Sequence, residues 1–142
     1  MRAEKGAATV EFALFAMFLV LIIGGIVDIG RGLYTAIAIN DAAQEGAIFA
    51  AFTDDVAGQP ITVDDITARV IASTSNPDLT VDEVDVVCAE QPRARRSGSQ
   101  ITVEVSHTID LITPFISDWF GGALTIERSA TADRFFDDCP TT

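Results

Sequence analysis

An uncharged apolar segment near the N-terminus constrains this chain more than any other feature. Residues from Phe12 to Val27 include no charged side chain, and extending the segment back to Ala7 adds only one, Glu11. Twenty-one residues of α-helix measure about 31 Å, which matches the hydrocarbon core of a bilayer. The segment therefore predicts one membrane-spanning helix.

The helix is expected to continue beyond the membrane. No proline occurs before Pro60, so nothing forbids one helix from about Ala7 to Phe52, a length of about 69 Å. Its second half must then project into water or lie along a partner. Close packing at four internal glycines is favoured over local unwinding. These glycines are Gly24, Gly25, Gly30 and Gly32.

Flanking charge predicts the orientation of this helix. Arg2 and Lys5 precede the apolar segment, and the positive-inside rule keeps such an end in the cytoplasm. Residues from about position 30 onward are then expected outside. A cleaved secretory signal peptide is the rival interpretation, but the apolar segment is too long for a typical signal core. The small-residue pattern Ala36-Ile37-Ala38 also comes too late after Val27.

The rest of the chain is acidic. Residues 53–142 hold sixteen acidic and six basic side chains, a net charge of −10 out of −12 for the whole chain. Such a domain stays soluble and repels nucleic-acid phosphates. Its one basic cluster, Arg93, Arg95 and Arg96, lies beside proline, serine and glycine and is interpreted as a solvated loop, with a partner-docking patch as the alternative.

Residues 53–142 are expected to form an α+β domain. After a turn at residues 53–58, Thr62 and Asp65 form a capping-box pattern that starts a helix, and Ser75-Asn76-Pro77 ends it. Alternating apolar and polar residues predict three antiparallel strands, of which residues 101–110 give the clearest signal. The other two lie near residues 84–88 and 124–132. Thr113-Pro114 opens, and Gly121-Gly122 closes, a short helix before the last strand.

Two cysteines, Cys88 and Cys139, lie in this acidic region. An even number of cysteines in an exported domain suggests a disulfide. A bridge would close a loop of about 51 residues, worth about 4 kcal/mol in the chain-entropy model. The alternative is two unpaired thiols, one of them buried in a strand.

No catalytic motif accompanies these features. The one histidine, His107, falls on the inward face of a strand by alternation, where a structural role is favoured over that of a base. The sequence contains no Cys-x-x-Cys, His-Glu-x-x-His or phosphate-binding loop, and its paired acids lack the spacing of a calcium loop. It therefore predicts no enzyme, no catalytic residue, no metal site and no cofactor.

Glu11 is the unusual residue of the apolar segment. A carboxylate inside a membrane-spanning helix costs about 3 kcal/mol on insertion scales, so such a charge usually has a partner. Cleavage after Gly6 would supply a cation, the new amine on Ala7, and would make Glu11 the fifth residue of the mature chain. The alternative is that Glu11 lies near the lipid headgroups and snorkels.

This arrangement resembles a type IV prepilin signal, in which a short basic leader ends at glycine and glutamate occupies the fifth mature position. The neighbouring stretches look like those of the TadE-like family of the tight-adherence (Flp) pilus system. They are Gly6 to Leu14, Gly25 to Arg31 and Asn40 to Ala47, with weaker similarity from Val103 to Pro114 and from Ile126 to Ala132. Gln44 departs from the pattern, since a basic residue is common there.

The resemblance implies three parts: a leader at residues 1–6, a transmembrane and extended helix at 7–52, and an exported pilin-like domain at 53–142. Glu11 would neutralise the Ala7 amine of a neighbouring subunit. The implied role is a structural subunit or minor pseudopilin, anchored in the bacterial inner membrane with a cytoplasmic N-terminus. Its partners would be other pilin subunits, a prepilin peptidase and the pilus secretion platform. The alternative is an uncleaved, single-pass, membrane-anchored binding or accessory protein.

A stripe of small residues follows the apolar segment. Ala38, Ala42, Gly46 and Ala50 recur at four-residue intervals, which places them on one helix face. Small side chains let another backbone approach closely. Two partners stay open for this face: the sheet of the same domain, or a helix of a neighbouring subunit in a filament.

Overall fold

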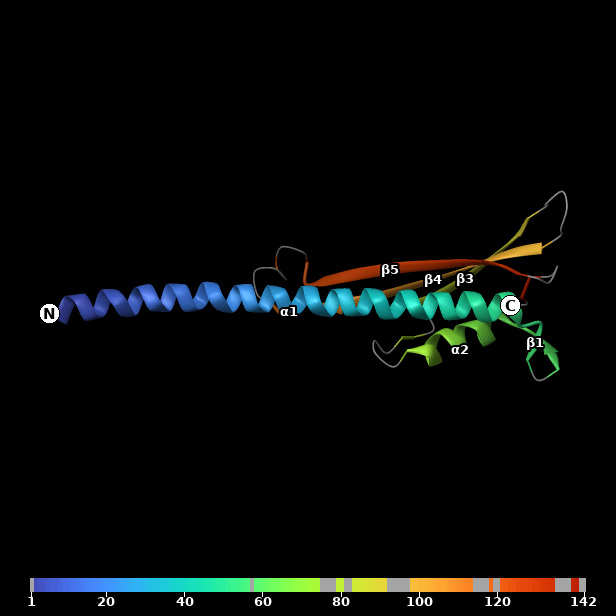
Figure 1. The fold of residues 1–142 in the computed structure, drawn as a ribbon, viewed down its shortest axis with the longest axis horizontal. Helices are drawn as coiled ribbons and strands as arrows, with labels where there is room; N and C mark the ends of the chain where they lie inside the picture. Colours follow the sequence, from blue (N-terminus) through green and yellow to red (C-terminus); the bar gives the residue numbers. More distant parts are fainter. Residues whose placement is uncertain are drawn as a thin grey trace. The chain divides into compact units, whose positions relative to one another are not determined.

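A computed structural model describes residues 2–56, 58–74, 79–80, 83–91, 98–113, 118, 121–134 and 139–140. Its first element, α1, is one unbroken helix, Arg2–Phe52 (Figure 1). The predicted end at Phe52 is confirmed, and the helix starts five residues before Ala7. By length and composition it can cross a membrane. The glycines do not unwind it.

The chain divides into two compact units, which are described separately. Unit 1 comprises Met1–Leu33 and Ile109–Leu124, and unit 2 comprises Tyr34–Thr108 and Thr125–Thr142. The first part of α1 thus belongs to unit 1 and the second part to unit 2.

Three strands form the predicted antiparallel sheet, in the order β3-β4-β5: β3 (Val84–Gln91), β4 (Gly98–Asp110) and β5 (Ala123–Asp133). The ladder between β3 and β4 runs from Val84 opposite Val105 to Gln91 opposite Gly98. On β4 and β5, threonine hydroxyls meet across the strands at 2.9–3.0 Å. The α+β class and the three strand predictions are confirmed.

Local chemistry explains how α2 (Val63–Ser73) begins. The Thr62 hydroxyl accepts from the Asp65 amide at 3.2 Å, and the Asp65 carboxylate accepts from the Thr62 amide at 2.9 Å. These hydrogen bonds lower the pKa of Asp65, chiefly through the Thr62 side chain. Ile61 and Ile66, at hydrophobic-staple positions, are both fully buried. The predicted capping box is confirmed.

The predicted turn at residues 53–58 is part of a small hairpin that the sequence did not indicate. Its strands are β1 (Asp55–Val56) and β2 (Gln59–Pro60), paired antiparallel. Gly58 has a φ of 78°, a conformation that favours glycine in the tight turn between them. The hairpin connects the end of α1 to α2.

In unit 2 the second part of α1 packs against both α2 and β4. A Cβ atom added to Gly46 would overlap Val70 of α2 and would lie 3.4 Å from Val103 of β4. Helix and sheet can approach this closely only because the residue at the contact has no side chain. The buried residues of this core are Ile39, Ala42, Ala43, Ala47, Ala50, Ile61, Ile66, Val70, Leu79, Ile101, Val103 and Val105.

Some expectations differ from the structure or fall outside it. By alternation, Leu124, Ile126, Ala130 and Ala132 are expected to share one face of the last strand, but Leu124 is 43% exposed, whereas the other three pack against the core. Alternation identifies one face of a strand and does not say whether anything covers it. The arginine cluster, Ser75-Asn76-Pro77 and most of the predicted short helix lie outside the described residues.

Candidate assembly helix

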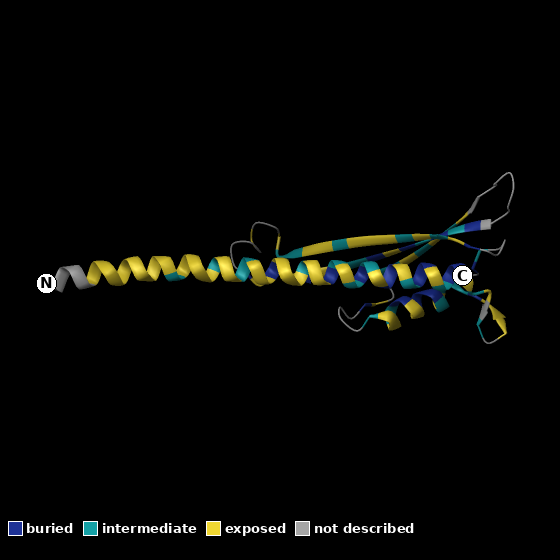
Figure 2. Cartoon of the chain, viewed as in Figure 1, coloured by how far each residue is buried: buried dark blue, intermediate teal, exposed yellow. Residues whose placement is uncertain are grey.

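The first part of α1 exposes a continuous apolar surface (Figure 2). None of residues 6–27 is buried, and Phe12, Val20 and Ile26 are 64–72% exposed. Apolar surface left in water is unfavourable by about 25 cal/mol for each Å². This stretch therefore requires lipid or a partner helix around it.

The predicted processing residues lie at the start of this surface. Gly6, Ala7 and Glu11 are all exposed on α1, and Glu11 follows Ala7 by about one helical turn. Among the side chains that the structure describes, no cation lies within salt-bridge distance of Glu11. Cleavage after Gly6 and pairing of Glu11 with a neighbour's Ala7 stay predictions, because they involve a second chain.

Asp28 marks the end of the apolar surface. Its side chain is 4% exposed, and its two carboxylate oxygens accept from the backbone amides of Ile112 at 3.0 Å and Thr113 at 2.8 Å. Arg31 lies 3.8 Å from the same carboxylate and donates to the Asp110 carbonyl at 3.3 Å. We call these contacts the Asp28 clamp. It joins α1 to the connection between β4 and β5 within unit 1.

One of the four glycines explains how this connection approaches α1. A Cβ atom on Gly24 would lie 2.7 Å from the Thr113 hydroxyl, which is too close. A Cβ atom on Gly32 would lie 3.6 Å from Ile109 of β4, an ordinary van der Waals distance, and one on Gly30 would meet nothing within 4 Å. The close-packing interpretation therefore holds for Gly24, and nothing in the structure explains Gly30.

The small-residue stripe is used inside unit 2. Ala42, Gly46 and Ala50 are buried, and Ala38 is partly buried. Of the two partners left open by the sequence, the structure shows the domain itself covering this face. The stripe is therefore not a free surface for a neighbouring helix.

Arg134 binds the C-terminal end of α1, a contact that the sequence did not predict. Arg134 is 5% exposed, and its guanidinium donates to the Ala50 carbonyl at 3.3 Å and to Asp54 at 3.5 Å. Carbonyls in the last turn of a helix lack intrahelical donors, and a cation there is stabilising. No periodic pattern reports such a contact, since Arg134 and Ala50 lie 84 residues apart.

Cys88 and Cys139 form a disulfide with their Cα atoms 5.9 Å apart. This distance is ordinary for a disulfide. The bridge joins β3 to the segment after β5, so it ties the C-terminal part of the chain to unit 2. The predicted disulfide is confirmed in the structure.

His107 of β4 contacts a carboxylate that lies just before β3. Its Nδ1 lies 2.6 Å from the Glu83 carboxylate, which also accepts from the amide and hydroxyl of Thr80. Burial opposes ionisation of Glu83, but the hydrogen bonds from Thr80 and His107 outweigh it and lower the pKa of Glu83. The contact between His107 and Glu83 joins the segment before β3 to β4.

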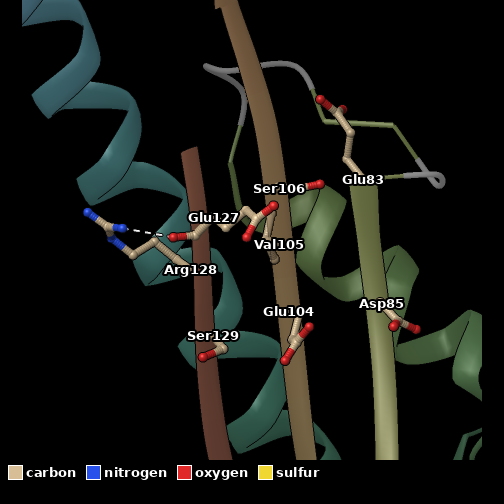
Figure 3. A pocket seen from close by; sticks show the side chains of 8 residues that line it. All are labelled: Glu83, Asp85, Glu104, Val105, Ser106, Glu127, Arg128 and Ser129. Carbon is tan, nitrogen blue, oxygen red and sulfur yellow. Dashed lines mark hydrogen bonds between the residues drawn. The ribbon is translucent and has the colours of Figure 1, made fainter. Parts of the chain in front are cut away.

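The sheet carries a hollow of about 300 Å³ (Figure 3). Four carboxylates line it, together with serines of β4 and β5 and Arg128, which donates to the neighbouring Glu127 carbonyl at 2.8 Å. The carboxylates are Glu83, Asp85, Glu104 and Glu127. Within the described residues, no group of histidine, cysteine and carboxylate side chains is arranged to hold a metal ion.

Part of α1 is similar to a known protein family. A family model described as TadE-like protein matches residues 6–47. The predicted resemblance is thereby confirmed over this stretch, which is less than a third of the chain. No curated protein and no solved structure matches the chain.

The TadE-like stretch coincides with structural features of α1. It begins at the predicted cleavage residue, Gly6, and includes Glu11 and Asp28. It ends at Ala47, within the part of α1 that packs in unit 2. The weaker similarity predicted near residues 103–132 lies outside the match.

Proposed function

We propose that this protein is a minor pilin-like subunit of a tight-adherence pilus, anchored in the inner membrane by the first part of α1. The TadE-like match suggests involvement in assembly of such a pilus, and the family is structural rather than enzymatic. One observation carries the proposal: the matched helix is apolar and exposed over residues 6–27 and then packs into its own domain. A single helix of this kind can join a membrane or filament core to an external domain.

The proposed maturation removes residues 1–6 and leaves an amine on Ala7. In a filament, that amine would neutralise Glu11 of a neighbouring subunit. A buried carboxylate is tolerated when it is paired, whereas an unpaired one destabilises its surroundings by several kcal/mol. The exposed position of Glu11 supports the proposal, because a residue already covered by its own chain could not meet a neighbour.

The proposed partners follow from this role. A prepilin peptidase would cleave after Gly6, other pilin subunits would surround the first part of α1, and the secretion platform would receive the chain. Arg2 and Lys5 support a cytoplasmic N-terminus, with the acidic domain on the far side of the membrane. The size of that domain favours a minor subunit, since major Flp pilins are much shorter.

A second candidate is an uncleaved, membrane-anchored accessory protein. Burial of the small-residue stripe within unit 2 favours it, because that face does not serve helix packing between subunits. In this case Glu11 would snorkel toward the headgroups and no neighbour would be required.

The deciding experiment is the intact mass and N-terminal sequence of the protein from membranes of its native host. A chain that starts at Ala7 supports the pilin proposal. A chain that retains Gly6 and the residues before it contradicts cleavage and favours the accessory protein.

Glu11→Ala provides the second test. We expect the variant to be cleaved but to assemble poorly, since the proposed charge pair is lost. Asp41→Ala, which changes another exposed carboxylate of α1, is the matched control. Pili formed at the normal level by Glu11→Ala would refute the pairing.

A further inference from the structure

We infer that the outer edge of β5, formed by Thr125, Glu127, Ser129 and Thr131, is a docking site for an extended segment of another protein. The docked segment adds a fourth strand to the sheet, and the segment that fits alternates basic and apolar side chains. The inference concerns unit 2 and depends neither on the proposed cleavage nor on the proposed membrane anchoring of α1.

Two hydrogen bonds show which backbone groups of β5 face β4. The Arg134 amide donates to the Ser99 carbonyl at 2.8 Å just after β5 ends, and the Leu111 amide donates to the Gly122 carbonyl at 3.1 Å just before β5 begins. Hydrogen-bonded and non-hydrogen-bonded pairs alternate along an antiparallel ladder. Because Arg134 and Gly122 are both even-numbered, the even-numbered residues of β5 turn their amides and carbonyls toward β4. The odd-numbered residues turn theirs away from the sheet.

The register between β4 and β5 is continuous, so this alternation is not interrupted. The hydroxyls of Thr125 and Thr108 meet at 2.9 Å, and those of Thr131 and Thr102 meet at 3.0 Å. Both strands advance by six residues between these two contacts, so no bulge lies between them. The outward-facing backbone groups therefore belong to the outer edge of β5, whose four residues are all exposed.

This edge is open to a partner. Among the residues that the structure describes, one group binds the outward-facing backbone: the Arg128 guanidinium, which donates to the Glu127 carbonyl at 2.8 Å (Figure 3). Natural edge strands are commonly protected from further pairing by lysine, proline or a bulge. β5 contains neither lysine nor proline. The other edge strand of the sheet, β3, contacts α2, so β5 is the edge left for a partner.

The outer face of the sheet favours basic side chains on the added strand. Side chains of a strand alternate between the two faces of a sheet, and on the outer face β5 borders the hollow that four carboxylates line. Two of these, Asp85 of β3 and Glu104 of β4, stand directly opposite each other, and like charges in such a pair are destabilising. A lysine or arginine that reaches past Glu127 toward the hollow reduces this repulsion.

The inner face favours apolar side chains at the alternate positions. Ile126, Ala130 and Ala132 of β5 pack against the core and are still partly exposed. Apolar side chains on a neighbouring strand cover such residues and remove their surface from water. The two faces together define a segment in which basic and apolar residues alternate.

Arg128 opposes docking in the free protein. It is the one basic residue of β5, and it occupies the Glu127 carbonyl that a docked strand needs. Its even number places it at an inner-face position, and inward-pointing charges on edge strands discourage pairing with another chain. Docking therefore requires Arg128 to release this carbonyl.

Peptide binding to the full chain in detergent micelles tests the inference. The probe is a fluorescent nine-residue peptide that alternates lysine and valine, and fluorescence anisotropy measures its affinity. We expect it to bind at least about tenfold more tightly than a peptide that alternates glutamate and valine, because the hollow beside β5 is acidic. Equal affinities of the two peptides, or no binding of the lysine peptide, overturn the inference.

N-methylation of the peptide separates strand pairing from general attraction between opposite charges. In an antiparallel pair, the residues opposite the outward-facing positions of β5 share their face and exchange hydrogen bonds with them, so the lysine amides face β5. We expect N-methylation of the lysine amides to weaken binding at least about tenfold, and N-methylation of the valine amides to leave it unchanged. The reverse pattern supports docking of a parallel strand at the same edge. Equal effects of the two modifications overturn the inference.

Variants of the full chain locate the site on β5. Ser129→Pro removes one outward amide, and proline is tolerated where the amide of an edge strand faces solvent. We expect at least about tenfold weaker binding of the lysine peptide, whereas Ser129→Ala, the matched control, keeps both the amide and the affinity. The melting temperature of each variant reports whether it is folded. A folded Ser129→Pro chain that binds as tightly as the unaltered chain contradicts the proposed site.

Arg128→Ala tests the opposing role of this arginine. It frees the Glu127 carbonyl and should strengthen binding of the lysine peptide about threefold or more. Arg69→Ala removes the same charge from a half-exposed position on α2 and should change the affinity by less than about twofold. Strengthening of equal size in both variants contradicts the proposed role of Arg128.

Discussion

The two parts of α1 have the same backbone and opposite surroundings. Residues 6–27 include no buried side chain, whereas Ile39, Ala43 and Ala50 in the second part are completely buried. The first part has large apolar residues on all sides, as a helix in lipid does. The second has small residues on the faces that meet α2 and the sheet. One continuous helix therefore depends on two different environments for its stability.

Removal of the first part of α1 should have the largest effect, because it tests whether the second part is stable without it. A chain that lacks residues 1–26 retains the Asp28 clamp and all of unit 2. We expect vesicle binding to fall by roughly 100-fold or more, because the residues proposed to span the membrane are gone. The cooperative thermal transition should remain. Loss of that transition would show that the second part of α1 depends on the first.

The disulfide should affect only the second part of α1. Replacing Cys88 and Cys139 together by serine should lower the free energy of unfolding by about 4 kcal/mol, since the bridge closes a long loop. Amide exchange in a bilayer mimic should become faster across residues 35–51 and stay unchanged across residues 6–27. Equal acceleration in both stretches would contradict the comparison.

Glycine substitutions sharpen the contrast at single positions. Gly46→Ala places a methyl group against Val70 and should destabilise unit 2 by about 1–3 kcal/mol through overpacking. Gly30→Ala is the matched control, because a Cβ atom there meets nothing within 4 Å. It should be neutral or stabilising by up to about 1 kcal/mol. Denaturant unfolding of both variants measures the difference.

Acid should lower the stability of unit 2 by less than the substitutions above. The folded state lowers the pKa values of Asp65 and Glu83 below 3.8 and 4.5, so these carboxylates stabilise the fold at neutral pH. That contribution is complete above those values and is lost as the pH falls through the lowered pKa values. The melting temperature should drop below about pH 4. For Glu83→Gln we expect a smaller drop in melting temperature on acidification than for the unaltered chain. A drop of the same size would show that Glu83 does not contribute.

Local sequence patterns predicted the parts of the fold that depend on contacts between residues close in the sequence. The capping box at Thr62 and Asp65 needs contacts only three residues apart, and the strand at residues 101–110 needs only alternation. Both were predictable for that reason. The helix end at Phe52 was predictable because a turn pattern follows it.

The features that escaped prediction depend on distant partners. Asp28 binds amides 84 and 85 residues away, so the sequence showed only a carboxylate near Arg31. The stripe at Ala42 and Gly46 was predicted as a packing face, but its composition could not choose between a sheet and a neighbouring helix. The exposure of Leu124 likewise depends on what covers that face of β5.

The contact between Arg134 and Ala50 also has a consequence for biosynthesis. A ribosome adds roughly 5–20 residues each second, so Arg134 emerges about 4–17 s after the helix end that it caps. For that interval the last turn of α1 is complete but lacks the arginine that later binds its carbonyl. A nascent chain of this protein thus passes through a period in which another donor, such as a side chain of a chaperone, can occupy the place that Arg134 later takes.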